Sequence, residues 1–80
     1  MNLPLDDVGR AVIGYLIRNK CATFSELYPL VRDLITEKGL YSRLERWVRS
    51  GLLNSRYVLG RKVYCISEEA AIILKREQNT

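Results

Sequence analysis

The chain has 80 residues, 48% of them hydrophobic and 28% charged, and its 13 Lys and Arg against 9 Asp and Glu give a net charge of +4. This length fits a single domain over residues 1–80, and the composition is typical of a globular protein rather than a disordered tail. Two cysteines and no histidine argue against a zinc site, which needs about four soft or imidazole ligands. Without histidine or a G-x-S-x-G motif, the sequence also offers no activated nucleophile. We therefore expect no enzyme, no metal and no cofactor.

Location and partner class follow from the same data. No apolar run approaches the ~18–20 residues of a membrane-spanning helix. The first residues, Met-Asn-Leu-Pro-Leu-Asp-Asp, are acidic, unlike the basic start of a signal peptide. We expect a cytoplasmic protein with no membrane partner, and its positive charge favours polyanionic partners.

A first helix is expected over about residues 7–19. Asp6 or Asp7 can accept hydrogen bonds from the free amides at its start. Ile13 and Ile17 lie on a second apolar face, which must be covered by a fourth helix or by another subunit. The main buried face follows the i, i+3, i+4 spacing and consists of Val8, Ala11, Val12, Tyr15 and Leu16.

A short connection over 19–22 has room for one or two residues of strand before a second helix over about 24–34. Thr23 and Glu26 fit the S/T-x-x-E capping box at the start of that helix. Pro29 lies beyond the first turn, where a proline removes an amide donor and clashes with the preceding turn. We expect this helix to be kinked or to start late.

A third helix is expected over 37–50, with Thr36 as its cap and Gly51 as its left-handed stop. Leu40, Leu44, Trp47 and Val48 define its core face. The opposite face is cationic and polar, with Tyr41 and Arg43 on its flanks and with Lys38, Ser42, Arg46 and Arg49 along it.

Two strands rich in Val, Tyr and Ile follow over 53–66, around a turn at Leu59-Gly60-Arg61, which is a hairpin pattern. Ser67 then caps a last helix over about 68–77, and the acidic Glu68 and Glu69 suit its positive N-terminal end. Ile72 points away from the inward-facing residues of this helix.

Charge is concentrated on the third helix and the hairpin. Seven of the 13 Lys and Arg lie within 36–66, with only Glu37 and Glu45 to oppose them, so this stretch carries +5 where the whole chain carries +4. Such a distribution is the electrostatic footprint of a nucleic-acid contact. The alternative is a basic face that is merely solvated.

The order helix, strand stub, helix, helix, hairpin, helix resembles the winged helix-turn-helix family, particularly the compact MarR-, PadR- and ArsR-like transcription regulators and their archaeal and viral relatives. Residues 40–53, L-Y-S-R-L-E-R-W-V-R-S-G-L-L, resemble the recognition helix and its Gly-Leu exit. Residues 61–70, R-K-V-Y-C-I-S-E-E-A, resemble the second wing strand and the start of the last helix. The resemblance covers about 7–75, and Pro29 and the segment 32–35 depart from it.

The resemblance implies an α+β fold: a three-helix core, a two-stranded wing with room for a third short strand, and a C-terminal helix. It implies sequence-specific binding of double-stranded DNA by a transcriptional regulator, with the third helix in the major groove and the wing on the backbone. Arg side chains would read guanine edges and hydroxyls would serve bases or phosphates. The implied DNA-binding residues are Lys38, Tyr41, Ser42, Arg43, Arg46, Arg49, Arg56, Arg61 and Lys62.

Two further functions stay open. A winged helix can serve as a protein–protein interaction module in a transcription or replication complex, although apolar rather than Arg-rich exposure would then be expected on the third helix. Binding of single-stranded DNA or RNA would require exposed aromatic side chains.

The resemblance also implies a homodimer, and Ile13, Ile17 and Ile72 are the candidate surface that joins two protomers through the first and last helices. Two cysteines in a cytosolic protein are usually free thiols. In winged helices, however, the strand stub pairs with the second wing strand, which would bring Cys21 beside Cys65 and allow a disulfide.

Overall fold

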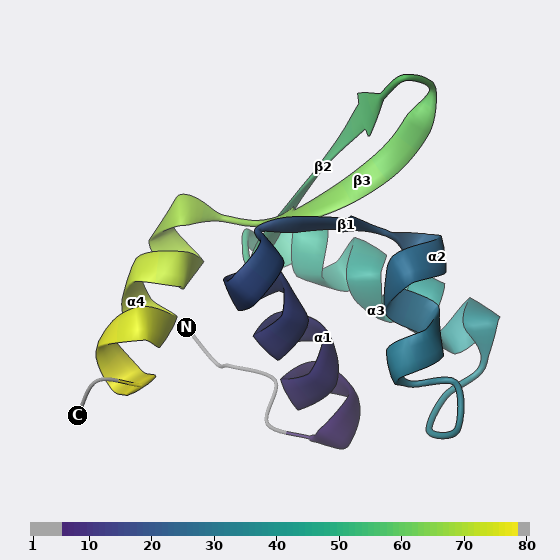
Figure 1. The fold of residues 1–80 in the computed structure, drawn as a ribbon, viewed down its shortest axis with the longest axis horizontal. Helices are drawn as coiled ribbons and strands as arrows, with labels where there is room; N and C mark the ends of the chain where they lie inside the picture. The colour runs from purple at the N-terminus through teal and green to yellow at the C-terminus, as the bar shows by residue number, and fades with distance from the viewer. Residues whose placement is uncertain (1–5, 79–80) are drawn as a thin grey trace.

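The computed structural model describes residues 6–78, which form a three-helix core, a sheet with a projecting hairpin and a last helix beside them (Figure 1). This is the predicted α+β winged-helix architecture. Residues 1–5 and 79–80 of the domain predicted over 1–80 lie outside the described residues. The elements in chain order are α1 (Asp7–Asn19), β1 (Cys21–Thr23), α2 (Phe24–Leu27), a 3-10 helix (Tyr28–Leu30), α3 (Glu37–Ser50), β2 (Leu53–Val58), β3 (Arg61–Ile66) and α4 (Glu68–Gln78).

The helix starts are set by side-chain caps. Asp6 accepts a hydrogen bond from the amide of Gly9 at 2.9 Å, so it is Asp6 rather than Asp7 that caps α1. Thr23 and Glu26 form the predicted capping box at the start of α2. Thr36 caps α3 through the amide of Gly39 at 3.0 Å, and Gly51 ends α3 with a φ of 87°. The three caps satisfy backbone amides that have no partner within the helix, and the left-handed Gly51 turns the chain away at the end of α3.

The second helix is much shorter than the predicted span of 24–34. The α-helix ends at Leu27 and continues as a 3-10 helix that contains Pro29 and ends at Leu30. The proline has no amide hydrogen to continue the helical bonding. Residues 31–36 then form a turn that leads into α3.

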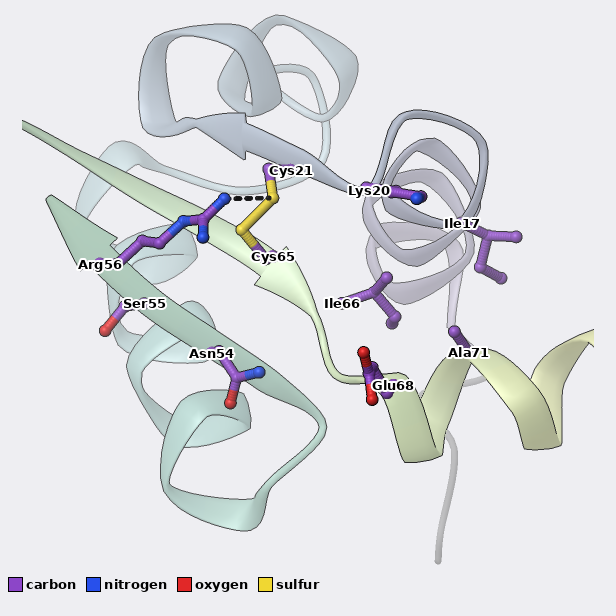
Figure 2. A pocket seen from close by; sticks show the side chains of 10 residues that line it. All are labelled: Ile17, Lys20, Cys21, Asn54, Ser55, Arg56, Cys65, Ile66, Glu68 and Ala71. Atoms are coloured by element: carbon purple, nitrogen blue, oxygen red, sulfur yellow. Dashed lines mark hydrogen bonds between the residues drawn. A yellow bond between two sulfur atoms is a disulfide. The ribbon is translucent and has the colours of Figure 1, made fainter. Parts of the chain in front are cut away.

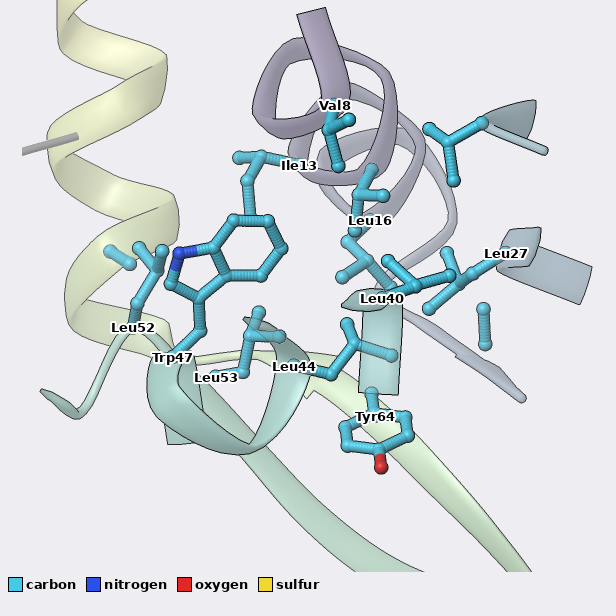
Figure 3. Packing of buried hydrophobic residues seen from close by; sticks show 14 of the residues in the cluster. Val8, Ile13, Leu16, Leu27, Leu40, Leu44, Trp47, Leu52, Leu53 and Tyr64 are labelled. Atoms are coloured by element: carbon cyan, nitrogen blue, oxygen red, sulfur yellow. The ribbon is translucent and has the colours of Figure 1, made fainter. Parts of the chain in front are cut away.

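The core lies between α1, α3 and the sheet, and Figure 3 shows its largest side chains. Ile13 is among them: its side chain lies beside the Trp47 ring and the residue is only 5% exposed. The prediction that Ile13 contributes to a dimer surface is therefore wrong, because α3 covers this part of α1 within one protomer.

The sheet has the strand order β1-β3-β2, and both pairings are antiparallel. β1 pairs with β3 as the resemblance implied, and Cys21 lies directly opposite Cys65. The two residues form a disulfide rather than the free thiols expected of a cytosolic protein. Because β1 pairs only with residues 63–65, the outer part of the β2–β3 hairpin projects beyond the body as a free wing (Figure 1). None of the helices described over residues 6–78 is long and apolar enough to cross a membrane.

Candidate nucleic-acid interface

The exposed face of α3 is the centre of the candidate interface. Leu40, Leu44 and Trp47 face the core, so the residues on the other side of the helix are left to solvent. A shallow hollow of about 380 Å³ runs along this side. Its lining residues are Tyr41, Ser42, Glu45, Arg46 and Arg49. Lys38 is exposed one turn earlier on the same helix. The face thus combines guanidinium and hydroxyl donors, which suit phosphate oxygens and base edges.

The wing is attached to α3 by a polar network around Glu45. The Lys62 ammonium lies 3.0 Å from both carboxylate oxygens of Glu45, and the Tyr64 hydroxyl donates to the same carboxylate at 2.8 Å. The ammonium also lies 5.6 Å from the centroid of the Tyr41 ring, which is within cation–π range. Lys62 is thus committed to Glu45, whereas the sequence predicted it as a phosphate contact.

The same network shifts three pKa values. The hydrogen bond from Lys62 lowers the pKa of Glu45, and the carboxylate in turn raises the pKa of Lys62. Burial of Tyr64, together with its hydrogen bond to Glu45, raises the pKa of the phenol. The pair is therefore charged at neutral pH, and the hydroxyl keeps the proton that it donates.

Arg43 is directed away from the predicted groove-facing side. Its guanidinium forms a two-pronged ion pair with Asp6 at the start of α1 and lies 5.9 Å from the centroid of the Trp47 ring. The hydrogen bonds that Arg43 and the Gly9 amide donate to the Asp6 carboxylate lower the pKa of Asp6 to about 2. Arg43 thus joins α3 to α1, and its charge is neutralised by the cap of α1.

Arg56 and Arg61 lie on the wing face opposite Lys62. Side chains alternate along a strand, and in the β2–β3 register Arg56 faces Val63 whereas Lys62 faces Tyr57. Arg56 is exposed and lies 3.9 Å from the Cys21 sulfur, beside the disulfide (Figure 2). Among the described residues, five of the predicted cations form no ion pair: Lys38, Arg46, Arg49, Arg56 and Arg61.

A second hollow, of about 560 Å³, lies between the end of α1, the sheet and the start of α4 (Figure 2). The half-buried Ile17 lines it together with the disulfide, and its predicted part in a dimer surface stays a prediction. Ile72, in contrast, is exposed on α4. In the described part of the chain, no three metal-binding side chains come together.

Sequence reasoning missed the roles of Asp6 and Glu45. Asp6 was recognised only as a helix cap, and Glu45 only as an acid among cations. Asp6 is 37 residues from Arg43 and Glu45 is 17 residues from Lys62. The only signal for these pairs is the fold, because no local pattern links residues so far apart.

Comparison with known proteins supports the architecture. No family model matches this chain, and no curated protein shows significant sequence similarity to it. Among solved structures, the chain is similar to diamide-treated YodB from B. subtilis, with a TM-score of 0.76 and 15% sequence identity. The match covers 96% of this chain and 77% of the YodB chain. At this identity the likeness shows the fold alone, which is a small α+β winged helix.

Proposed function

We propose that this chain binds double-stranded DNA through α3 and the wing and acts as a transcriptional regulator. The observation that carries the proposal is that some cations of α3 and the wing are paired with acids and the others are not. Arg43 and Lys62 are neutralised by acids that hold the elements together. Of the described residues in α3 and the wing, the remaining cations are exposed and have no acidic partner. Unpaired cations that are spread over a helix face and a neighbouring hairpin suit a polyanion with many phosphates better than they suit an acidic small molecule.

The two elements would have different roles. An α-helix fits the major groove, where Arg46 and Lys38 reach base edges and Ser42 and Tyr41 donate hydroxyl hydrogen bonds. Arg49 lies near the end of α3, and Arg56 and Arg61 lie on the wing, where charge and reach suffice for phosphate contacts. α3 would therefore supply sequence preference, and the wing would supply affinity.

The proposed functional form is a homodimer. Two winged helices related by a twofold axis would present their recognition helices about 34 Å apart, one turn of DNA. With Ile13 in the core, the exposed Ile72 of α4 and the half-buried Ile17 are the predicted residues left for this contact.

A mobility-shift titration with salt tests the proposal. The three phosphate contacts of Arg49, Arg56 and Arg61, at about 0.9 each, predict that log affinity falls against log salt with a slope of about −2.7 for each bound protomer. Arg61→Ala should reduce this slope by about one and weaken binding to all sequences alike. Arg46→Ala should cost about 1–3 kcal/mol on the preferred site and blur its sequence preference.

Arg18→Ala is the matched control, because it removes an exposed cation from the last turn of α1. It should leave the affinity for DNA close to that of the unmodified protein. Equal losses from all three substitutions would mean that only net charge matters and would rule out α3 as the reader. Absence of duplex binding at low salt would leave the protein-interaction module as the function.

A further inference from the structure

The tip of the wing exposes a run of apolar side chains. Leu59 is 99% exposed, and the preceding Tyr57 and Val58 are 72% and 45% exposed. Single exposed apolar residues are common on protein surfaces. A run of three at the end of a projecting hairpin is different, because it presents unshielded apolar surface to any molecule that approaches the wing (Figure 1).

The backbone at the tip is unfavourable for leucine. Val58 pairs with Arg61, so Leu59 and Gly60 form a two-residue turn, and their φ angles are 52° and 79°. Positive φ at both central residues defines the type I′ turn, which favours Asn, Asp or Gly. Leucine in this region is strained by its side chain. The fold itself thus gains nothing from Leu59, neither a packing contact nor a relaxed turn.

Cationic side chains lie behind the tip on both faces of the wing. Arg61 and Arg56 are exposed on one face of the wing, and Lys62 on the other face is held against α3 by Glu45. Leu59 lies two residues past the Tyr57–Lys62 pair, or about 7 Å at the usual rise of a strand. An apolar tip with cations behind it, on a hairpin that projects from the body, is complementary to a groove with anionic walls and a floor of base-pair edges (Figure 1).

We propose that Leu59 enters the minor groove of bound duplex DNA and inserts between two adjacent base pairs. The inference rests on the proposed DNA-binding function and adds a mode of contact to it. Apolar wedges that partly unstack a base step are a known way to kink DNA, and the cations beside the wedge hold the phosphates of the bent duplex. Pyrimidine–purine steps such as TA unstack most easily. The wing would therefore select deformable steps without reading base edges.

The test compares the unmodified protein with two variants at the tip. Leu59→Asn removes the apolar group, leaves the charge unchanged and suits the turn, so the variant should fold and melt at an equal or higher temperature. Leu59→Met keeps an apolar side chain of similar size and the same charge, and it serves as the matched control. The probe is a duplex with central TA steps that carries 2-aminopurine, whose fluorescence rises when its base unstacks. Binding is followed by anisotropy.

The unmodified protein and Leu59→Met should raise the 2-aminopurine fluorescence. Leu59→Asn should lose this rise and about tenfold in affinity, with an unchanged salt slope. If all three proteins bind with equal affinity and equal fluorescence, the wedge is refuted while DNA binding stands. If the unmodified protein does not bind the duplex at all, both proposals fail. Binding to anionic phosphatidylserine vesicles that depends on Leu59, without a change in 2-aminopurine fluorescence, would overturn the wedge in favour of a lipid contact.

Discussion

Glu45 holds Lys62 of the wing in an ion pair, so under the proposed DNA-binding function its charge decides whether Lys62 can contact a phosphate. Glu45→Gln keeps the shape of the side chain but releases Lys62, which the carboxylate now holds at 3.0 Å. We expect one additional phosphate contact, so the salt slope of DNA binding should become steeper by about one. The same change should cost about 1 kcal/mol of stability, since a partly exposed charged hydrogen bond is lost. Glu37→Gln removes the same charge from the same helix without releasing Lys62 and should leave the slope unchanged.

The stability of this variant should also depend less on pH. Lys62 holds the pKa of Glu45 below its ordinary value of 4.5. A depressed pKa means that the group stabilises the fold above its unfolded pKa and loses this contribution as pH falls through the folded pKa. The difference in unfolding free energy between the unmodified protein and Glu45→Gln should therefore shrink below about pH 4.5. Chemical denaturation across this range measures it, and a constant difference would contradict the assignment.

Ile13 shows that the spacing of apolar residues along a helix does not by itself decide which face is buried. The prediction separated Ile13 from the stripe of Val12 and Leu16, but the structure buries all three on α1. The error is about one residue of rotation, or 100° around the helix. The correct face depends on where Trp47 of α3 lies against α1, and that contact is set by tertiary packing rather than by local spacing.

The short strand β1 is joined to the sheet by a disulfide as well as by hydrogen bonds. It has three residues, and its Cys21 is bonded to Cys65 of β3 across a separation of 44 residues. On the chain-entropy estimate, closing a loop of this length contributes about 4 kcal/mol. Reduction should therefore lower the melting temperature by roughly 15 °C or more for a domain of this size. Calorimetry with and without a strong reductant measures the change.

The double variant Cys21→Ser with Cys65→Ser is the control for that experiment. It should melt where the reduced protein melts and should not respond to reductant. A melting temperature of the unmodified protein that reductant leaves unchanged would show that the bond does not stabilise the fold.

Elements could be predicted where their signals are local. Thr36 and Gly51 mark α3 because a cap and a left-handed stop need only adjacent residues, and the structure has both. The second helix was less predictable. Its capping box starts it at the expected place, but the apolar spacing of Leu27, Leu30 and Val31 continues beyond Pro29, where the α-helix has already ended. Leu27 is buried at the end of the α-helix and Val31 is buried in the turn, whereas Leu30 in the 3-10 helix is 41% exposed. The apolar spacing thus predicted two buried residues correctly, but it did not predict the backbone conformation between them.

The whole molecule combines a small core with an uncovered apolar helix face, and this is the basis for predicting a dimer. A domain of about 80 residues has a modest core and gains stability from a partner. Ile72 is 54% exposed on α4, and Ile73 beside it is 38% exposed. Ile72→Glu should convert the protein to monomers and should weaken binding to a twofold-symmetric site more than binding to random duplex, because only the symmetric site engages two recognition helices.

Leu34→Glu is the matched control: Leu34 is also 54% exposed but lies in the turn before α3. Sedimentation velocity measures the assembly state, and an unmodified protein that sediments as a monomer at high micromolar concentration would refute the dimer.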